Sequence, residues 1–511
     1  MLCGPPAAGS GLIDDIILIY MWLRCYGVAY RDGTSGPSTL GAEVERLKSI
    51  VSSQFEVYDI RVTYDAVVFF VDCNSATLES NFDSIRRTLV PINYIPFLQK
   101  RGGEYTITVG KRKPVGRKGN IPNIILLAAT LISTTIAGAF LWAGYYNSNN
   151  IWTLGSFLNG MVYFVTPVML ILGTHEMGHF LVARRFRVNA SLPYFIPSIP
   201  PLGTLGAFIS IRDPFPNRKA LLEIGIAGPI AGFLVTIPVA FVGFYLTQMN
   251  PVLSPPLTPG TQVFTVPYLY SLMLSLFPFS SNLNIFPTAF AAWVGFFATA
   301  LNLLPAGQLD GGHVARALLG EKSKYLGWAA ILGMVLLSFE FESWILIALF
   351  VLLVGVRHPP PLNDISKLKV SRKMLGVVAL AMFLVTFTPF PIVTVSSSTS
   401  FTISSSTQLI SMNSASSVQY FNITVVNTGN VREAVNITQL QNANVVATFA
   451  YPPGGGQYGT FIVLNIDPGA TASASVRIAA TSTIVSGTYI LQIQGSSNGY
   501  VSSIPITVNY S

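Results

Sequence analysis

The chain has 511 residues, of which 51% are hydrophobic and only 10% are charged, and its formal net charge is +8. This charged fraction is well below the roughly one quarter that is usual in soluble domains, so the composition indicates a membrane protein. Its basic residues cluster in short loops without interleaved aromatic residues, which argues against a nucleic-acid-binding protein.

Residues 1–38 form an N-terminal segment that the sequence does not explain. Charges interrupt its apolar stretch, so it is a poor signal peptide and a weak transmembrane helix. Residues 39–112 predict a small α+β domain, which we interpret as a folded domain without chemistry of its own. Its expected helices are 41–51 and 78–89, and its expected strands are 55–62, 66–71 and 105–109.

The three cysteines are Cys3, Cys25 and Cys73, and they show no zinc-finger spacing and no disulfide framework. A Cys25–Cys73 disulfide and free thiols on a cytosolic domain are the two alternatives. We favour free thiols.

Residues 113–120 are a basic linker directly before the first strong apolar run. Because positive charge is retained on the cytoplasmic side, the linker places the N-terminal domain in the cytoplasm. Residues 121–395 predict a polytopic α-helical membrane core with about seven helices, and the charges of the loops agree with one topology at every crossing. The expected helices are 121–142, 158–183, 221–246, 287–304, 326–338, 344–356 and 375–395.

The second apolar helix contains Gly173-Thr174-His175-Glu176-Met177-Gly178-His179. Residues i and i+4 lie on one face of a helix, so His175 and His179 can reach one metal ion. Glu176 then stands beside that ion, where it can take a proton from bound water. Ionisable residues at membrane depth are costly and are functional by default, which favours this interpretation over a chance match.

A second motif, running from Asn302 to Gly312, ends the apolar helix 287–304 and supplies Asp310. Pro305 and Gly307 break the helix, which allows Asp310 to fold back toward the metal. Two histidines and one carboxylate leave the fourth tetrahedral position open for water, as in catalytic zinc sites. His313, three residues past Asp310, is an alternative ligand or a neighbour of the ligands.

HExxH together with NxxPxxxLDG, each on an apolar segment, resembles the site-2 protease family of intramembrane zinc metalloproteases. The resemblance covers about residues 120–360. It implies that His175, His179 and Asp310 bind one catalytic zinc ion and that Glu176 is the catalytic base. It also makes Asn302 a candidate donor to the developing oxyanion, the alternative being that Asn302 caps backbone groups near Pro305.

Residues 188–219 are apolar but rich in proline and glycine, which disfavours a spanning helix. Residues 202–211 within this stretch read as a β-strand. Non-helical backbone survives at membrane depth only where protein or a wet cavity covers it, so we expect a re-entrant β loop beside the site. Its free edge is a candidate for pairing with an unwound substrate. The alternative is a loop that only plugs the bundle.

Residues 396–511 have a different composition, rich in Ser, Thr, Asn, Val and Ile. Six short alternating strands separated by turn signals predict an Ig-like β-sandwich on the extracytoplasmic side. It resembles small adhesion-type modules of prokaryotic, especially archaeal, cell surfaces. Asn422, Asn436 and Asn509 begin glycosylation sequons. The expected strands are 418–426, 445–451, 460–466, 474–479, 489–493 and 504–508.

The sequence thus predicts a multi-domain integral protein of the cell membrane whose core hydrolyses peptide bonds within transmembrane segments of other membrane proteins. The expected cofactor is one zinc ion, and the expected partners are transmembrane protein substrates and the lipid bilayer, with no nucleic acid. Two other classes remain as alternatives, a metal-binding transporter and a non-catalytic receptor or scaffold. A transporter does not need a glutamate next to the first histidine, and the sequence shows no internal repeats.

Overall fold

The computed structural model describes residues 37–511 apart from residues 64, 75, 113–118, 149, 255–257, 280–282, 357, 441–443 and 454–456. Most of the unexplained segment 1–38, with Cys3 and Cys25, and most of the basic linker 113–120 therefore lie outside the described residues. The chain divides into two compact units. Unit 1 comprises residues 1–253 and 266–391, and unit 2 comprises residues 254–265 and 392–511.

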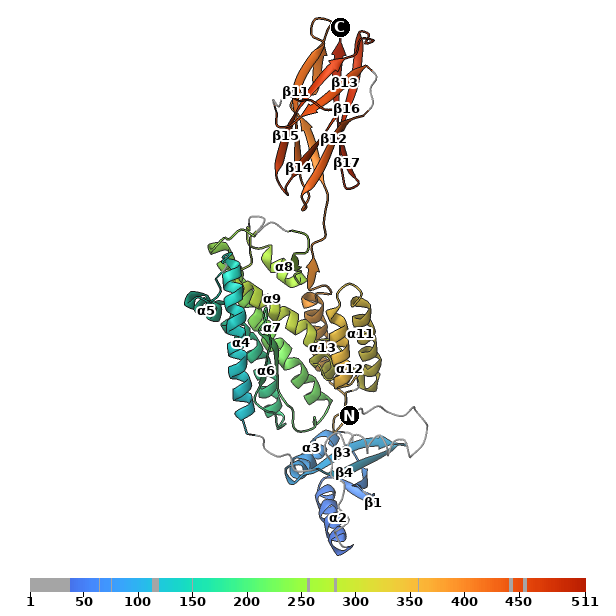
Figure 1. Ribbon diagram of the computed structural model, residues 1–511. Helices are drawn as coiled ribbons and strands as arrows, with labels where there is room; N and C mark the ends of the chain where they lie inside the picture. Colours follow the sequence, from blue (N-terminus) through green and yellow to red (C-terminus); the bar gives the residue numbers. More distant parts are fainter. Residues whose placement is uncertain are drawn as a thin grey trace. The chain divides into compact units, whose positions relative to one another are not determined.

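Unit 1 begins with an α+β module in which two helices pack on an antiparallel sheet of strand order β1-β2-β4-β3 (Figure 1). β2 alternates buried and less buried side chains, with Phe69 fully buried, as expected for a sheet that covers one core. The sequence did not predict β3, which contains Pro96; proline is disfavoured in strands. The elements are α2 (Pro37–Ser52), β1 (Glu56–Val62), β2 (Ala66–Asp72), α3 (Leu78–Leu89), β3 (Tyr94–Arg101) and β4 (Glu104–Lys111).

Cys73 follows β2 and is a half-buried free thiol. Burial, with a smaller contribution from Asp72, raises the pKa of its thiol to about 11. The thiol is therefore protonated near neutral pH.

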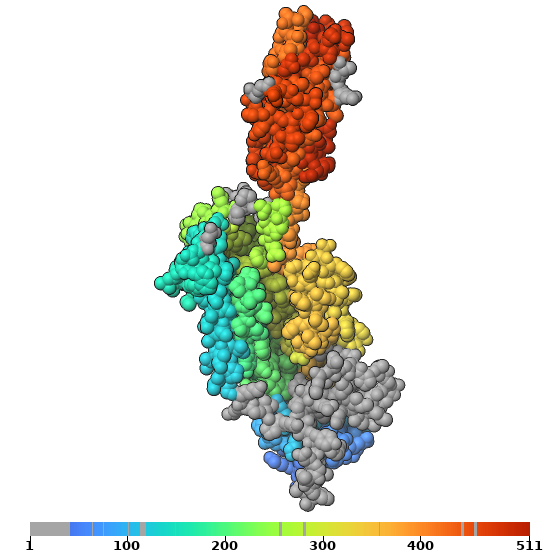
Figure 2. Space-filling view, viewed as in Figure 1, coloured from blue at the N-terminus to red at the C-terminus, as the bar shows by residue number. Residues whose placement is uncertain are grey.

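Three helical stretches of unit 1, among the described residues, are long and apolar enough to cross a membrane. They are α4 (Ile121–Tyr145), the continuous run Leu154–Arg185 and α7 (Arg218–Met249). α4, cyan in Figure 2, carries exposed apolar side chains; Ile124 and Ile132, for example, are more than 60% exposed. An apolar surface of this kind is suited to contact with lipid acyl chains.

The run Leu154–Arg185 consists of α5 (Leu154–Gly160), one π turn (η2, Met161–Val165) and α6 (Thr166–Arg185). Pro167 explains the irregularity, because it has no backbone N–H to donate to the preceding turn. The carbonyl of Tyr163, which a regular helix would pair with residue 167, instead accepts a 2.6 Å hydrogen bond from the Thr288 hydroxyl. The π turn is thus stabilised from a neighbouring helix.

The other helices of unit 1 are shorter than a full span, although the sequence predicted about seven crossings. α9 has 16 residues and is buried on most sides, whereas α13 ends at Thr386 rather than near residue 395. Pro389 and Pro391 follow that end, and proline cannot continue a helix. These helices are α8 (Tyr268–Leu274), α9 (Pro287–Asn302), α10 (Asp310–Leu319), α11 (Ser323–Leu337), α12 (Ser343–Val354) and α13 (Val370–Thr386).

A β-hairpin lies between α6 and α7. Its strands are β5 (Tyr194–Pro197) and β6 (Thr204–Phe208), which pair antiparallel. The sequence predicted a strand at the position of β6 but read β5 as part of a proline-rich loop. The hairpin is held against α4, where the Asn123 amide donates to the Leu192 carbonyl and the Ser133 hydroxyl donates to the Gly203 carbonyl.

Unit 2 contains two sheets that share one apolar core. One sheet has the order β10-β17-β16-β12-β14 and the other has the order β13-β15-β11-β9. All six expected strands are present, and β9, β10 and β12 are additional. β12 contains the buried Glu433, which weakens its apolar alternation. A short pair, β7 (Gln262–Phe264) and β8 (Ile392–Thr394), also belongs to this unit.

The strands of the two sheets are β9 (Phe401–Ser405), β10 (Leu409–Met412), β11 (Val418–Asn427), β12 (Glu433–Gln439), β13 (Val445–Ala450), β14 (Phe461–Ile466), β15 (Thr471–Ala480), β16 (Gly487–Ser497) and β17 (Tyr500–Tyr510).

Candidate metal centre

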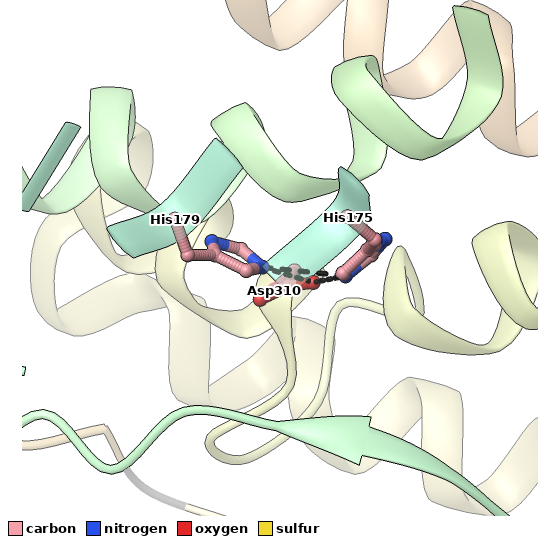
Figure 3. Close-up of side chains that lie close together, drawn as sticks. All are labelled: His175, His179 and Asp310. Carbon is pink, nitrogen blue, oxygen red and sulfur yellow. Dashed lines mark hydrogen bonds and ion pairs between the residues drawn. The ribbon is translucent and has the colours of Figure 1, made fainter. Parts of the chain in front are cut away.

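Three side chains from two distant parts of unit 1 converge at one point (Figure 3). His175 and His179 lie on α6, and Asp310 is the first residue of α10. The Nε2 atoms of the two histidines are 3.3 Å apart, and each lies 3.2 Å from Oδ2 of Asp310. Among the described residues, these three form the group of His, Cys, Asp and Glu side chains close enough to hold one metal ion.

The spacing of the three atoms fits a zinc ion. Zinc bonds to histidine nitrogen at 2.0–2.1 Å, so neighbouring ligand atoms of a tetrahedral site lie about 3.4 Å apart. The observed separations of 3.2–3.3 Å are close to that value. Three protein ligands leave the fourth position of a tetrahedron open, which distinguishes a catalytic from a structural zinc site.

The tautomer of His179 is set by the backbone. Its Nδ1 lies 2.7 Å from the carbonyl oxygen of Ile224 on α7. A carbonyl oxygen only accepts hydrogen bonds, so Nδ1 carries the hydrogen and Nε2 presents its lone pair toward Asp310. Metal-binding histidines commonly have such a partner on their other nitrogen, because it fixes the ring and raises the basicity of the ligating atom.

Glycines of α7 give the histidine rings their space. A Cβ atom on Gly228 would lie 2.1 Å from Nε2 of His179, and one on Gly232 would lie 3.1 Å from Cβ of His175. From the other side, a Cβ on Gly178 of α6 would lie 2.6 Å from the Ala227 carbonyl. The two helices therefore approach closely because these positions lack side chains.

A tight turn brings Asp310 back to the histidines. Gly307 has a φ of 57°, in the left-handed region that favours glycine. Gly311 and Gly312 pack directly on this turn, since a Cβ on either would come within 2.3 Å of a carbonyl oxygen of Leu303 or Gly307. The two glycines after Asp310 thus allow the first turn of α10 to sit against the end of α9.

Two further polar side chains border the cluster. Glu176 is 4% exposed, and its Oε1 lies 3.9 Å from Nε2 of His175. The backbone N–H of Ile209, one residue beyond β6, lies close to its carboxylate. The amide nitrogen of Asn302, the last residue of α9, lies 3.3 Å from Nε2 of His175.

The structure places His313 elsewhere. Its Nδ1 lies 2.6 Å from Nε2 of His358, and it is not part of the three-residue cluster. The sequence offered no signal for this pair, because His358 lies in a basic loop 45 residues further on. The contact of Ile209 with Glu176 was likewise invisible in the sequence, since a backbone donor has no residue signature.

Comparison with known proteins finds similarity in the region that holds this arrangement. The model of peptidase family M50 matches residues 163–339. The probable zinc metalloprotease EGY1 of Arabidopsis thaliana chloroplasts is 31% identical over 245 residues, which are 43% of this chain and 42% of the relative. The probable zinc metalloprotease EGY2 of Oryza sativa subsp. indica chloroplasts is 30% identical over 239 residues, covering 45% and 43% of the two chains.

This chain therefore spans less than half the length of these curated relatives. Among solved structures, a FixG-related protein from Vibrio parahaemolyticus matches 22% of this chain and 96% of its own, at 10% identity and a TM-score of 0.17. The matched region 163–339 includes all of α6, α7, α9 and α10, and with them His175, His179 and Asp310. The part of the chain that holds the metal centre thus matches peptidase family M50 and is similar to zinc metalloproteases.

Proposed function

We propose that the protein is an intramembrane zinc endopeptidase that cuts peptide bonds within transmembrane segments of other membrane proteins. The observation that carries the proposal is that Asp310 of α10 converges with His175 and His179 of a long apolar helix, with Glu176 buried beside them. A buried carboxylate next to three ligands is what hydrolysis by activated water needs.

A zinc ion bound at this site supplies a Lewis acid and lowers the pKa of water at the open position. Glu176 acts as general base, accepting the proton of the attacking water and passing it to the leaving amine. The backbone N–H of Ile209 lies near the Glu176 carboxylate, and we assign it the role of orienting that carboxylate for this transfer. The Asn302 amide, 3.3 Å from His175, donates to the carbonyl oxygen of the substrate as negative charge develops on it.

A transmembrane substrate hides its peptide bonds within its own helix and must unwind before cleavage. We assign the β5–β6 hairpin, as a re-entrant element at membrane depth, the role of pairing with the unwound strand. β6 packs against α6, and Ile209, which directly follows its last residue Phe208, lies near Glu176. The hairpin therefore presents extended backbone beside the general base.

We further propose that the chain crosses the membrane about seven times and that the shorter helices span it together with neighbouring segments. In this topology residues 39–112 lie in the cytoplasm and the sandwich 396–511 lies outside. Arg184 and Arg185 in the last turn of α6 support a cytoplasmic end for that helix. We propose that the sandwich is Ig-like, because its two sheets are mostly antiparallel and share one core. We also propose that it binds substrate ectodomains or the cell envelope.

Replacing Glu176 with glutamine tests the proposed chemistry. The amide keeps the size of the side chain but cannot accept a proton, so cleavage of transmembrane peptides should fall by roughly 10² to 10⁴-fold. Zinc content, measured on the same purified samples, should not change. Equal cleavage by wild type and the variant would refute the mechanism, and metal transport without cleavage would favour the transporter alternative.

Replacing Ala207 with proline tests the role of the hairpin. Proline removes a backbone donor from β6, so cleavage should be lost while zinc remains bound. The matched control is Val263→Pro in β7, a short strand of unit 2, which should leave cleavage intact. Unchanged turnover of the Ala207 variant would show that the hairpin only fills the bundle.

A further inference from the structure

A hydrogen-bonded pair of histidines lies one turn beyond Asp310. His313 Nδ1 is 2.6 Å from His358 Nε2, and His358 Nδ1 is 2.6 Å from the carbonyl oxygen of Pro359. The two rings stand at 82° to each other, and Phe215 packs against both of them. The proposed chemistry uses neither histidine.

The direction of these hydrogen bonds follows from the carbonyl at one end. The Pro359 oxygen only accepts, so His358 carries its hydrogen on Nδ1 and accepts at Nε2, and His313 must donate from Nδ1. Burial and the neighbouring His313 hold the pKa of His358 well below its usual range, which agrees with a neutral ring. A separation of 2.6 Å is a hydrogen bond and is shorter than the spacing of about 3.4 Å between ligands of one zinc ion.

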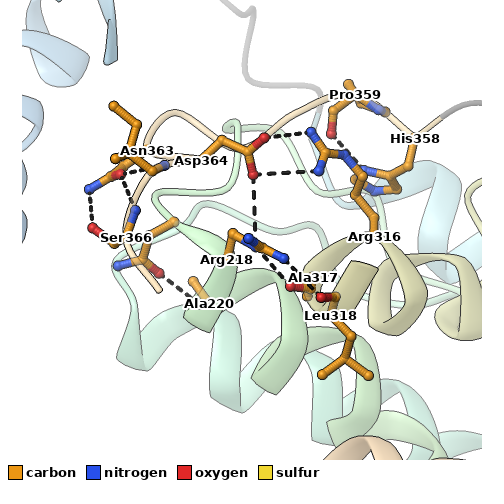
Figure 4. A network of polar contacts seen from close by, with 12 residues as sticks. Arg218, Ala220, Arg316, Ala317, Leu318, His358, Pro359, Asn363, Asp364 and Ser366 are labelled. Atoms are coloured by element: carbon orange, nitrogen blue, oxygen red, sulfur yellow. Dashed lines mark hydrogen bonds and ion pairs between the residues drawn. The ribbon is translucent and has the colours of Figure 1, made fainter. Parts of the chain in front are cut away.

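Arg316 makes a second connection from the same helix, one turn further on. It is 4% exposed, and its two terminal nitrogens lie 2.7 and 3.4 Å from the carboxylate of Asp364 (Figure 4). Asp310, His313 and Arg316 are spaced by three residues, so they follow one side of α10. Arg218 of α7 completes the network by donating to the carbonyls of Ala317 and Leu318 at the end of α10.

Residues 358–364, which contact His313 and Arg316, are held in place by other parts of unit 1. The backbone N–H groups of Leu362 and Asn363 donate to the carbonyls of Phe215 and Pro216. The Leu362 side chain is fully buried in the core of the α+β module, and its carbonyl accepts from Leu98 of β3. The partners of α10 on residues 358–364 are thus anchored to two other parts of unit 1.

We propose that His313 and His358 are positioning residues for Asp310. Their hydrogen bond fixes the orientation of the first turn of α10, and so holds the Asp310 carboxylate at 3.2 Å from both histidines of α6. The inference rests on the proposed function only in that these three residues bind zinc. Residues that orient metal ligands without binding the metal themselves typically contribute 10 to 100-fold to metal affinity.

The test measures the zinc affinity of the full-length protein in detergent, by competition with a chelator. His313→Leu removes the donor and should weaken zinc binding by about 10 to 100-fold. His313→Asn is the conservative variant, because its amide nitrogen stands near the position of Nδ1, and it should bind zinc within about threefold of wild type. His358→Leu should match His313→Leu, and the double Leu variant should be no weaker than either single variant, because both break one contact.

The matched control is Arg372→Gln, which breaks the 2.7 Å contact with Glu223 between α13 and α7 without touching the histidine pair. It should leave zinc affinity unchanged. Wild-type affinity in His313→Leu, equal losses in His313→Asn and His313→Leu, or the same loss in Arg372→Gln would each overturn the proposal. Zinc affinity is read without cleavage, so an inactive but zinc-binding wild type would refute the proposed function and leave this inference standing.

Discussion

The core of the sandwich in unit 2 and the metal centre in unit 1 use burial in opposite ways. Among its described residues, the sandwich fills its interior with a cluster of 21 buried hydrophobic residues from both sheets. The metal centre buries His175, Glu176 and His179 to 6%, 4% and 5% exposure within an otherwise apolar helix. In the sandwich each buried side chain removes apolar surface from water, so stability is spread over many residues. At the metal centre a few buried polar groups are tolerated because they face one another.

Burial of a polar group alone does not make a site, as the sandwich also shows. Glu433 is fully buried on β12, where one carboxylate oxygen accepts from Ser497 and the other has no hydrogen-bond partner in the part of the chain that the structure describes. It belongs to no group of described residues that could hold a metal. Convergence of several ligands, and not burial, therefore separates the metal centre from the sandwich.

The sharpest test of this contrast is Gly228→Ala. The new Cβ would lie 2.1 Å from Nε2 of His179, whose other nitrogen is held by Ile224, so the ring cannot keep its position. Zinc affinity should fall by roughly 100-fold or more, although alanine favours the helix by about 1 kcal/mol. Chelator competition on the full-length protein measures it. Gly173→Ala, where a Cβ meets nothing within 4 Å, is the control and should bind zinc normally.

The converse test is Ile437→Ala in β12 of the sandwich. Ile437 is fully buried, so its truncation should lower the free energy of unfolding of unit 2 by about 2–5 kcal/mol. Hydrogen exchange of residues 396–511 measures this, and zinc affinity should not change. Val446→Ala, at a side chain that is 42% exposed, should cost no more than about 0.5 kcal/mol. A loss of zinc in the Ile437 variant would contradict the separation of the two regions.

The smallest expected effect is a pH dependence confined to unit 1. The pKa of His358 is lowered from 6.5 in the folded state, so the unfolded chain binds the proton more readily. The contribution of His358 to stability is therefore present above pH 6.5 and is lost as the pH falls below it, by at most about 1.4 kcal/mol per pH unit. Thermal unfolding of zinc-free wild type and His358→Gln between pH 7.5 and 5.5 measures it. Parallel pH profiles for the two proteins would exclude this role.

The sequence by itself determined those features that depend on neighbours within a few residues. Helical spacing put His175, Glu176 and His179 on one turn of an apolar segment, and alternation marked six strands of the sandwich. The LDG motif drew attention to Asp310 and the broken helix before it. These patterns are legible because the periods of helices and strands are short and because charge is rare in apolar runs.

Only the tertiary structure decided how distant segments meet. Asp310 is 131 residues from His179, and their approach depends on the packing of α6, α7 and α10 and on the glycines between them. The Ile224 carbonyl, the Ile209 amide and the pairing of His313 with His358 are contacts between segments whose spacing in the chain follows no period. The sequence did not predict β3 and β5, because each contains a proline, a residue that is disfavoured in strands. They are strands because they pair with β4 and β6.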